Sequence, residues 1–109
     1  MTSTISEILQ LRAIAQIALT THITPRVRSI SLSIDSSILE IIFRAYSNGP
    51  LPESALEALH CAVTEIQSSY PLGWKVKEEH RVLSEPHPME HLPLVVYGRC
   101  EDDWVDRSL

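Results

Sequence analysis

Two histidines in the proline-rich segment 84–93 have the spacing of a metal-binding pair. His87 and His91 stand four residues apart, with Glu85 and Glu90 nearby. This spacing binds metal when both rings project from one face of a helix. The prolines of the segment forbid a helix there, and no third ligand follows at a recognised spacing. The sequence therefore predicts a solvated loop, with no metal and no cofactor.

The spacing of the reactive side chains does not indicate nucleophilic catalysis. His60 and Cys61 are adjacent on a predicted helix, where neighbours point about a quarter-turn or more apart, so they cannot form a nucleophile–base pair. The serines of segment 29–37 alternate along a strand or fill a turn, and none lies in a G-x-S-x-G elbow. The glycines are isolated and form no phosphate-binding loop. We therefore expect a protein that is not an enzyme.

The acidic residues near the C-terminus offer a binding chemistry instead. Trp104 stands among carboxylates, and this combination suits the capture of Arg or Lys through charge and attraction to the ring face. The loop 84–93 supplies a second acidic group that would extend the same surface. The alternative is a frayed, solvated terminus. The predicted partner-binding residues are Glu85, Glu90, Glu101, Asp102, Asp103, Trp104 and Asp106.

Length and composition predict one domain, 1–109, with 101–109 as a short acidic tail. The chain has 109 residues, of which 44% are hydrophobic. This is enough to form a hydrophobic core without disulfide bonds or bound metal ions. Its formal charge of −5 disfavours direct nucleic-acid binding and suits a basic partner. No signal peptide or membrane span is visible, so we expect a cytoplasmic protein that does not bind membranes.

The two cysteines, Cys61 and Cys100, lie in no CxxC pair and near no ligand cluster. We expect both to be small buried or half-buried thiols in a reducing compartment. A single disulfide between them stays open as an alternative.

Two segments have the apolar spacing of an amphipathic helix, and each is followed by two segments that have the alternation of a β-strand. The first helix is predicted over 5–21, with a capping box between Thr4 and Glu7 and with Ile17 widening its apolar stripe. The second is predicted over 53–69, where a proline precedes its first residue and another follows its end. Helices this apolar on one side are expected to pack across a sheet.

Strands are predicted over 27–34, 38–46, 74–83 and 94–99. The short polar turn between the first two makes them an antiparallel hairpin. In the second strand, Leu39 and Phe43 are among the residues expected to face the core, and Tyr46 is expected to face out. In the third strand, Val82 is an expected inward residue.

The third strand also breaks the alternation, because Glu78 and His80 share the parity of its apolar residues. This break indicates an edge strand or a bulge. The full order, α-β-β-α-β-β, predicts an α+β fold: a four-stranded, mainly antiparallel sheet with the two helices packed on one face. The other face is expected to be solvated or to be a partner surface.

From about Leu11 to Glu101 the chain resembles immunity proteins of contact-dependent growth inhibition and related polymorphic toxin systems. The resembling segments are Leu11–Gln16 leading to Ile23–Arg28, Phe43–Tyr46 with Asn48-Gly49, Val63–Ile66 before Tyr70-Pro71, Ser84–Pro86 and Leu94–Arg99. The resemblance implies a cytoplasmic protein that binds a cognate toxin domain, often a nuclease, and blocks its active site or substrate surface. The Pro-His-Pro-Met-Glu-His loop and the tail depart from the family pattern, and such variable regions suit partner choice.

We therefore expect an immunity protein that neutralises a cognate toxin, with a basic protein as its partner. The alternative is a small homodimeric adaptor or chaperone-like domain that pairs through the strand at 74–83 or the open sheet face. A small enzyme or ligand binder is the third interpretation, and it requires a pocket with convergent polar groups.

Overall fold

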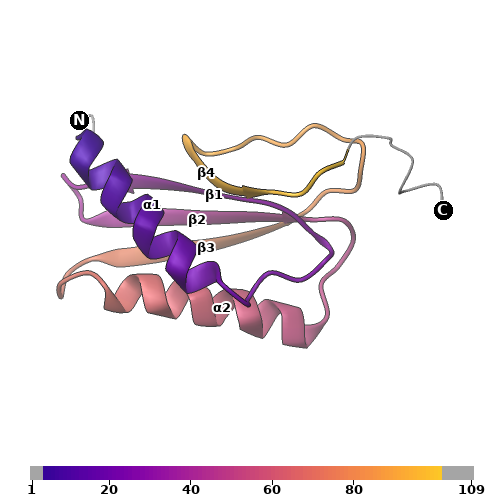
Figure 1. The fold of residues 1–109 in the computed structure, drawn as a ribbon, viewed down its shortest axis with the longest axis horizontal. Coiled ribbons are helices and arrows are strands. Elements are labelled where there is room, and N and C mark those ends of the chain that lie inside the picture. Colours follow the sequence, from indigo (N-terminus) through magenta and orange to yellow (C-terminus); the bar gives the residue numbers. More distant parts are fainter. Residues whose placement is uncertain (1–3, 102–109) are drawn as a thin grey trace.

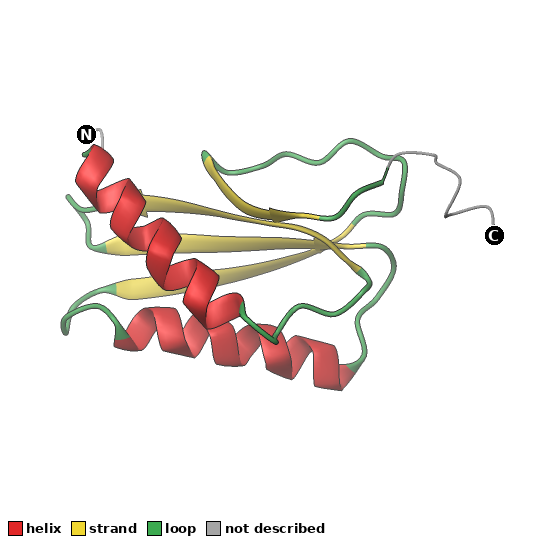
Figure 2. Cartoon of the chain, viewed as in Figure 1, coloured by secondary structure: helices red, strands yellow, loops and turns green. Residues whose placement is uncertain are grey.

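The computed structural model describes residues 4–101 and contains two helices and one four-stranded sheet (Figures 1 and 2). The predicted order of elements is confirmed. The elements are α1 (Ile5–Leu19), β1 (Val27–Asp35), β2 (Glu40–Ser47), α2 (Glu53–Ser68), β3 (Lys75–Val82) and β4 (Leu94–Gly98).

The sheet has the strand order β3-β2-β1-β4. β1 is antiparallel to both β2 and β4, whereas β2 and β3 are parallel. The parallel pair follows from the connection, because α2 carries the chain back to the starting end before β3 begins. The mainly antiparallel sheet is therefore confirmed, with one parallel pair, and β3 is confirmed as an edge strand.

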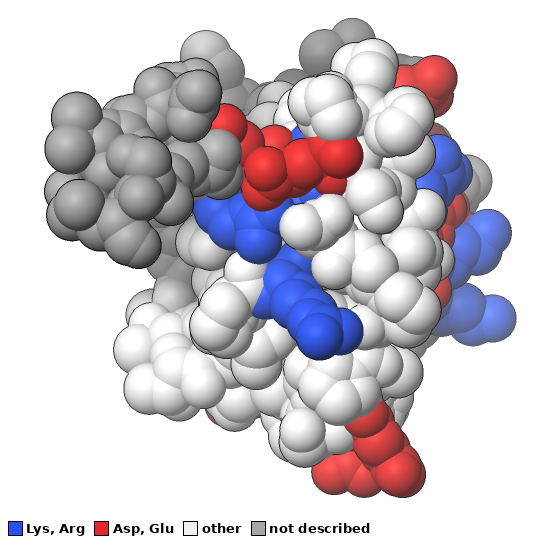
Figure 3. All heavy atoms as spheres, turned by 90° about the vertical axis from the view of Figure 1, so that its right-hand side faces the viewer, with Lys and Arg blue, Asp and Glu red and all other residues white. Residues whose placement is uncertain are grey.

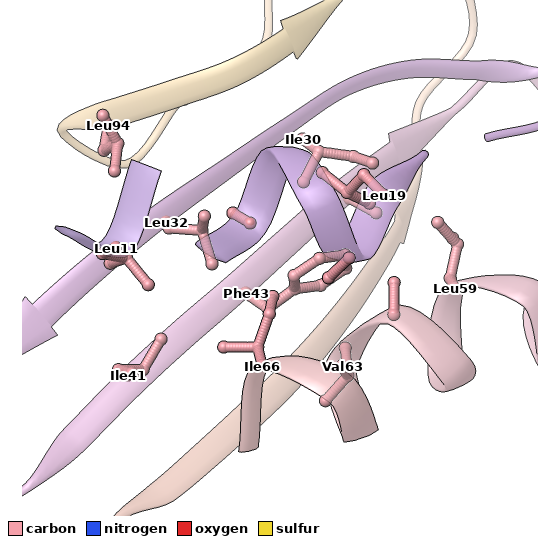
Figure 4. Close-up of a cluster of buried hydrophobic side chains, with 14 of the residues drawn as sticks. Leu11, Leu19, Ile30, Leu32, Ile41, Phe43, Leu59, Val63, Ile66 and Leu94 are labelled. Atoms are coloured by element: carbon pink, nitrogen blue, oxygen red, sulfur yellow. The ribbon is translucent and has the colours of Figure 1, made fainter. Parts of the chain in front are cut away.

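Both helices pack on one face of the sheet, where the hydrophobic core lies (Figure 4). Phe43 of β2 is fully buried, and its ring lies on the helix-facing side of the sheet, near both helices. Leu11 of α1, Leu59 of α2 and Leu32 of β1 contribute fully buried side chains to the same cluster. Burial of each such side chain contributes about 1.5–3 kcal/mol to folding, so this cluster fixes the helices on the sheet.

The capping box at the start of α1 is confirmed. The backbone N–H of Glu7 donates to Thr4 Oγ1 at 3.1 Å, and the backbone N–H of Thr4 donates to Glu7 Oε1 at 2.9 Å. These two bonds satisfy N–H groups that the first turn of a helix leaves unpaired. α1 ends two residues before the predicted boundary and α2 one residue before it, which is ordinary variation at helix ends.

Three apolar residues are more exposed than their spacing predicts. Ile17 is 74% exposed because it lies outside the stripe that α1 turns to the sheet. Leu39 has a positive φ of 54° in the turn, β2 begins only at Glu40, and Leu39 is 39% exposed. Val82 is 59% exposed and is the last residue of an edge strand.

The break in alternation along β3 is explained by a polar contact with α2. No bulge is present, because the pairing of β2 and β3 runs without a shift from Glu40–Lys75 to Ser47–Val82. Glu78 faces α2 and accepts a hydrogen bond from His60 at 2.9 Å, and His80 also contacts its carboxylate. The polar residues on this side of β3 therefore face one another at the margin of the core.

The sheet face opposite the helices is partly covered by the chain itself, whereas the sequence predicted that this face is either solvated or a partner surface. Segment 84–93 crosses this face over β1 and β2. Ser29 Oγ donates to Met89 Sδ at 3.3 Å, and Leu92 N–H donates to Ser31 Oγ at 3.0 Å. Tyr46, predicted to face solvent, is buried beneath this segment with 3% exposure.

Both cysteines are exposed, so the expectation of buried or half-buried thiols was wrong. Cys61 lies on the outer side of α2, one position away from the buried stripe that contains Leu59 and Ala62. Cys100 follows the end of β4. Within the described residues, neither helix has the length and apolar character needed to cross a membrane.

Candidate partner-binding surface

A buried ion pair joins the first strand to the last described residue. Arg28 Nε donates to Glu101 Oε2 and Arg28 Nη2 donates to Glu101 Oε1, each at 2.8 Å. The Arg28 side chain is 3% exposed and the Glu101 side chain 20% exposed. The third guanidinium contact is to the carbonyl oxygen of Leu83 at 2.8 Å, at the end of β3. The Arg28 side chain on β1 thus binds two distant parts of the chain, at Leu83 and at Glu101.

Arg99 extends this pair into a cluster of four charged side chains. Its guanidinium contacts the Glu85 carboxylate and lies 3.3 Å from Glu101 Oε2. Arg99 Nη1 also donates to the carbonyl oxygen of Pro25 at 2.7 Å. The structure therefore brings together two of the predicted site residues, Glu85 and Glu101, through a shared arginine.

Arg28 and Glu101 shift each other's pKa. The hydrogen bonds from Arg28 lower the pKa of Glu101 below its ordinary value, with burial opposing them. The same contact raises the pKa of Arg28. Glu101 is therefore ionised at neutral pH, and its charge is balanced by cations of the same chain. Figure 3 shows acidic side chains directly beside basic ones near the centre of this end of the molecule.

Glu90 lies apart from the cluster, on segment 84–93 over the sheet. Its backbone carbonyl oxygen accepts hydrogen bonds from Arg44 Nη1 at 2.9 Å and from Tyr46 Oη at 3.0 Å. Tyr46 Oη in turn accepts from the Glu90 backbone N–H at 3.1 Å. The Glu90 backbone is therefore bound to Arg44 and Tyr46 of β2. Glu90 is nevertheless an exposed residue.

The remaining predicted site residues, Asp102, Asp103, Trp104 and Asp106, lie outside the described residues. Glu101 immediately precedes them. The ion cluster therefore fixes the point from which this acidic sequence continues.

The residues that build this site but were not predicted from the sequence are arginines and a tyrosine. Arg28 and Arg99 organise the cluster, and Tyr46 holds Glu90. One signal was available, because Arg28 interrupts a strand of apolar and small residues and a buried arginine needs a charged partner. The identity of that partner, 73 residues away, had no signal in the sequence.

The histidines of segment 84–93 make local contacts. His87 Nδ1 lies 3.0 Å from the carbonyl oxygen of Ser84, and the His91 ring meets Tyr46 edge-on with centroids 6.2 Å apart. Among residues 4–101, no group of three or more His, Cys, Asp or Glu side chains is placed to hold a metal ion.

A hollow of about 270 Å³ lies beside Glu90 on this side of the sheet. It is lined by Tyr46, Arg81, Val82, Leu83, Pro88 and Glu90. Its mixture of apolar side chains and opposite charges suits contact with a protein side chain.

Comparison with known proteins decides the family. The model of the MafI2 immunity protein family matches residues 9–101, which span nearly all of the described chain. This chain belongs to the MafI2 immunity protein family. The match confirms the resemblance to immunity proteins of polymorphic toxin systems. No curated protein matches the chain.

Membership in the MafI2 immunity protein family gives the protein an immunity role against a toxin, and it implies a cognate toxin as protein partner. The matched region contains most of α1 and all of the other five elements of the fold, and it ends at Glu101. It therefore includes the whole ion cluster and stops where the acidic sequence 102–106 begins.

Proposed function

We propose that this protein is a cytoplasmic, non-catalytic inhibitor that binds its cognate toxin domain and blocks the active or substrate-binding surface of that domain. The observation that carries the proposal is the match to the MafI2 immunity protein family over residues 9–101. A protein that inhibits by binding needs a complementary surface rather than a catalytic centre.

We further propose that the toxin is a nuclease that works in a setting of contact-dependent growth inhibition. A nuclease presents a basic cleft to its phosphate substrate, and a protein of net charge −5 would be attracted to that cleft. The acidic residues Asp102, Asp103 and Asp106 would supply the charge, and Trp104 would supply an aromatic anchor of the kind that dominates binding energy.

The ion cluster supports this proposal by separating two kinds of acidic residue. Glu85 and Glu101 share the cations Arg28 and Arg99, so their charge is largely compensated within the molecule. Glu90 is exposed. Attraction of a basic toxin therefore rests on Glu90 and on residues 102–106, while Glu85 and Glu101 hold the point from which the acidic sequence continues.

The proposal is tested by co-expression with the toxin domain encoded next to this protein. We expect the protein to protect the host cell, to co-purify with the toxin domain in stoichiometric amount, and to abolish nucleic-acid cleavage by the purified toxin. Protection without inhibition of cleavage would contradict the nuclease proposal. Absence of both complex and protection would contradict the inhibitor proposal itself.

A homodimer paired through β3 is the second candidate, because β3 is an edge strand. Gln67 of α2 already occupies the start of this edge, since its side chain bonds the Trp74 carbonyl oxygen at 2.6 Å and the Val76 N–H at 2.9 Å. Pairing would therefore use residues 77–82 alone. Sedimentation equilibrium of the isolated protein tests the candidate, and a monomer at micromolar concentration would contradict it.

A further inference from the structure

A hollow of about 300 Å³ lies at the opposite end of the molecule from the ion cluster. The two helices diverge toward this end, where α1 begins and α2 ends (Figure 1). The hollow is open between them, above the end of β1. It is lined by Glu7, Gln10, Ile34, Ser69, Tyr70, Pro71 and Trp74.

The hydroxyl group of Tyr70, one of the residues that line this hollow, has unmet hydrogen-bonding capacity. Its oxygen is buried and has no hydrogen-bond partner within residues 4–101. Such groups are uncommon in folded proteins, because each one costs about 1–3 kcal/mol of lost hydration. Burial raises the pKa of Tyr70, and the nearby Glu7 carboxylate raises it further. The phenol is therefore protonated and lies within the field of Glu7.

The electrostatics of the hollow favour a cation. Glu7 stays ionised, because hydrogen bonds from the Thr4 backbone and the Ser36 side chain lower its pKa. The C-terminal end of α2 adds partial negative charge, and its last turn carries no basic residue. No Lys or Arg is among the described residues that line the hollow. The positive end of the α1 dipole and the hydrogen bonds to Glu7 offset part of this negative charge, but no cationic side chain among the described lining residues neutralises it.

The aromatic wall of the hollow adds a second attraction for a cation. Tyr70 and Trp74 lie with ring centroids 5.0 Å apart and planes tilted by 44°. Aromatic faces attract guanidinium and ammonium groups, and tryptophan does so most strongly. A carboxylate facing an aromatic pair is therefore suited to a side chain that is both charged and flat.

We propose that this hollow binds an arginine side chain presented by a protein partner. A guanidinium is planar and carries five N–H donors, so it can stack on an aromatic ring while donating to Glu7, and it can also donate to the Tyr70 oxygen once the Tyr70 side chain shifts to expose this buried atom. A lysine ammonium can donate but cannot stack in this way. The proposal stands apart from the toxin assignment, because it rests only on the lining of the hollow.

The rim of the hollow indicates that the arginine belongs to a protein. Leu72, next to the lining residue Pro71, is fully exposed, and Ile38 on the neighbouring turn is 61% exposed. The two segments meet, because the backbone N–H of Lys75 donates to the carbonyl oxygen of Leu39 at 2.9 Å. Exposed apolar side chains beside a charged pocket form the usual setting of a protein contact.

The first experiment titrates the protein with N-acetyl-argininamide and follows the indole resonance of Trp74 by NMR. We expect saturable shifts of Trp74 and of the Tyr70 ring. N-acetyl-norleucinamide, which has a similar length and no charge, is expected to produce none, and the lysine analogue is expected to bind at least threefold more weakly. Equal shifts with the arginine and norleucine probes, or none with arginine, would overturn the proposal.

Three variants link the binding to the lining residues. Glu7→Gln keeps the capping box, which accepts Glu or Gln at this position, while removing the charge. We expect it to weaken arginine binding roughly threefold or more. Tyr70→Phe should also weaken binding while leaving the fold intact. Glu57→Gln, which removes the same charge from the exposed side of α2, should bind arginine like the unmodified protein. Unchanged binding in both Glu7→Gln and Tyr70→Phe would overturn the proposal.

Discussion

Arg28 and Glu101 stand 73 residues apart in the chain and form two parallel hydrogen bonds of 2.8 Å. Arg28 lies near the start of β1 and is almost completely buried. A third bond links it to Leu83 at the end of β3. This one guanidinium therefore holds three segments together: the first strand, the chain leaving β3, and the last described residue.

Replacing Glu101 by alanine should destabilise the protein. The change leaves the Arg28 guanidinium buried without its main counter-ion, and breaking a buried pair in this way costs about 3 kcal/mol. The free energy of unfolding in urea measures the loss. Glu90→Ala is the matched control, because Glu90 is exposed and its backbone contacts survive, so its effect should stay below about 0.5 kcal/mol. Equal losses in both variants would contradict the role of the pair.

Stability should fall in acid partly through Glu101. Its pKa is lowered in the folded protein from an ordinary value of 4.5, so the ionised form is favoured by folding. The resulting stabilisation is present above the unfolded pKa and is lost as the pH falls through the folded pKa. The free energy of unfolding of Glu101→Gln should therefore depend less on pH below about pH 5 than that of the unmodified protein. Parallel curves for the two proteins would contradict this assignment.

The hydroxyl of Tyr46 should hold segment 84–93 on the sheet. It donates to the Glu90 carbonyl oxygen and accepts from the Glu90 N–H, so Tyr46→Phe leaves two backbone groups without this partner. We expect a loss of about 1–2 kcal/mol and faster amide exchange within 84–93. Tyr97→Phe on β4 is the control, and its exchange in 84–93 should match the unmodified protein. Slow exchange in both variants would show that other contacts hold the segment.

The order of the elements could be predicted because local patterns carry it. Ile30 and Leu32 alternate with serines along β1, and Thr4 with Glu7 forms the cap of α1. These signals depend on residues a few positions apart. The parallel pairing of β2 with β3 is also consistent with the helix that separates them.

The covering of the second sheet face could not be predicted, because it depends on contacts distant in the chain. Tyr46 and the serines of β1 have the spacing of a solvated face, yet they are buried by segment 84–93. A proline-rich segment has no periodicity from which its docking could be inferred. Glu85 and Glu101 could be predicted as site residues because they are acidic. The arginines that form ion pairs with them could not be predicted. Local patterns therefore located part of the site without indicating that its charges are compensated.

Charge reversal at Asp102 and Asp103 should slow association with the toxin. If these residues steer a basic cleft, Asp102→Lys with Asp103→Lys should lower the association rate constant roughly tenfold at low salt and flatten its salt dependence. The dissociation rate should change less, because steering acts before contact forms. Stopped-flow mixing at several salt concentrations measures both effects.

The matched control for this charge reversal is Glu57→Lys with Glu65→Lys, two exposed positions on α2. It changes the net charge by the same amount and leaves residues 102–106 intact. If the whole-protein charge alone governs association, the two double variants should slow it equally, and the local role of the acidic sequence would be wrong. If residues 102–106 face the basic cleft, the α2 variant should retain most of the rate, because exposed charges farther from a contact than a Debye length of about 8 Å are largely screened.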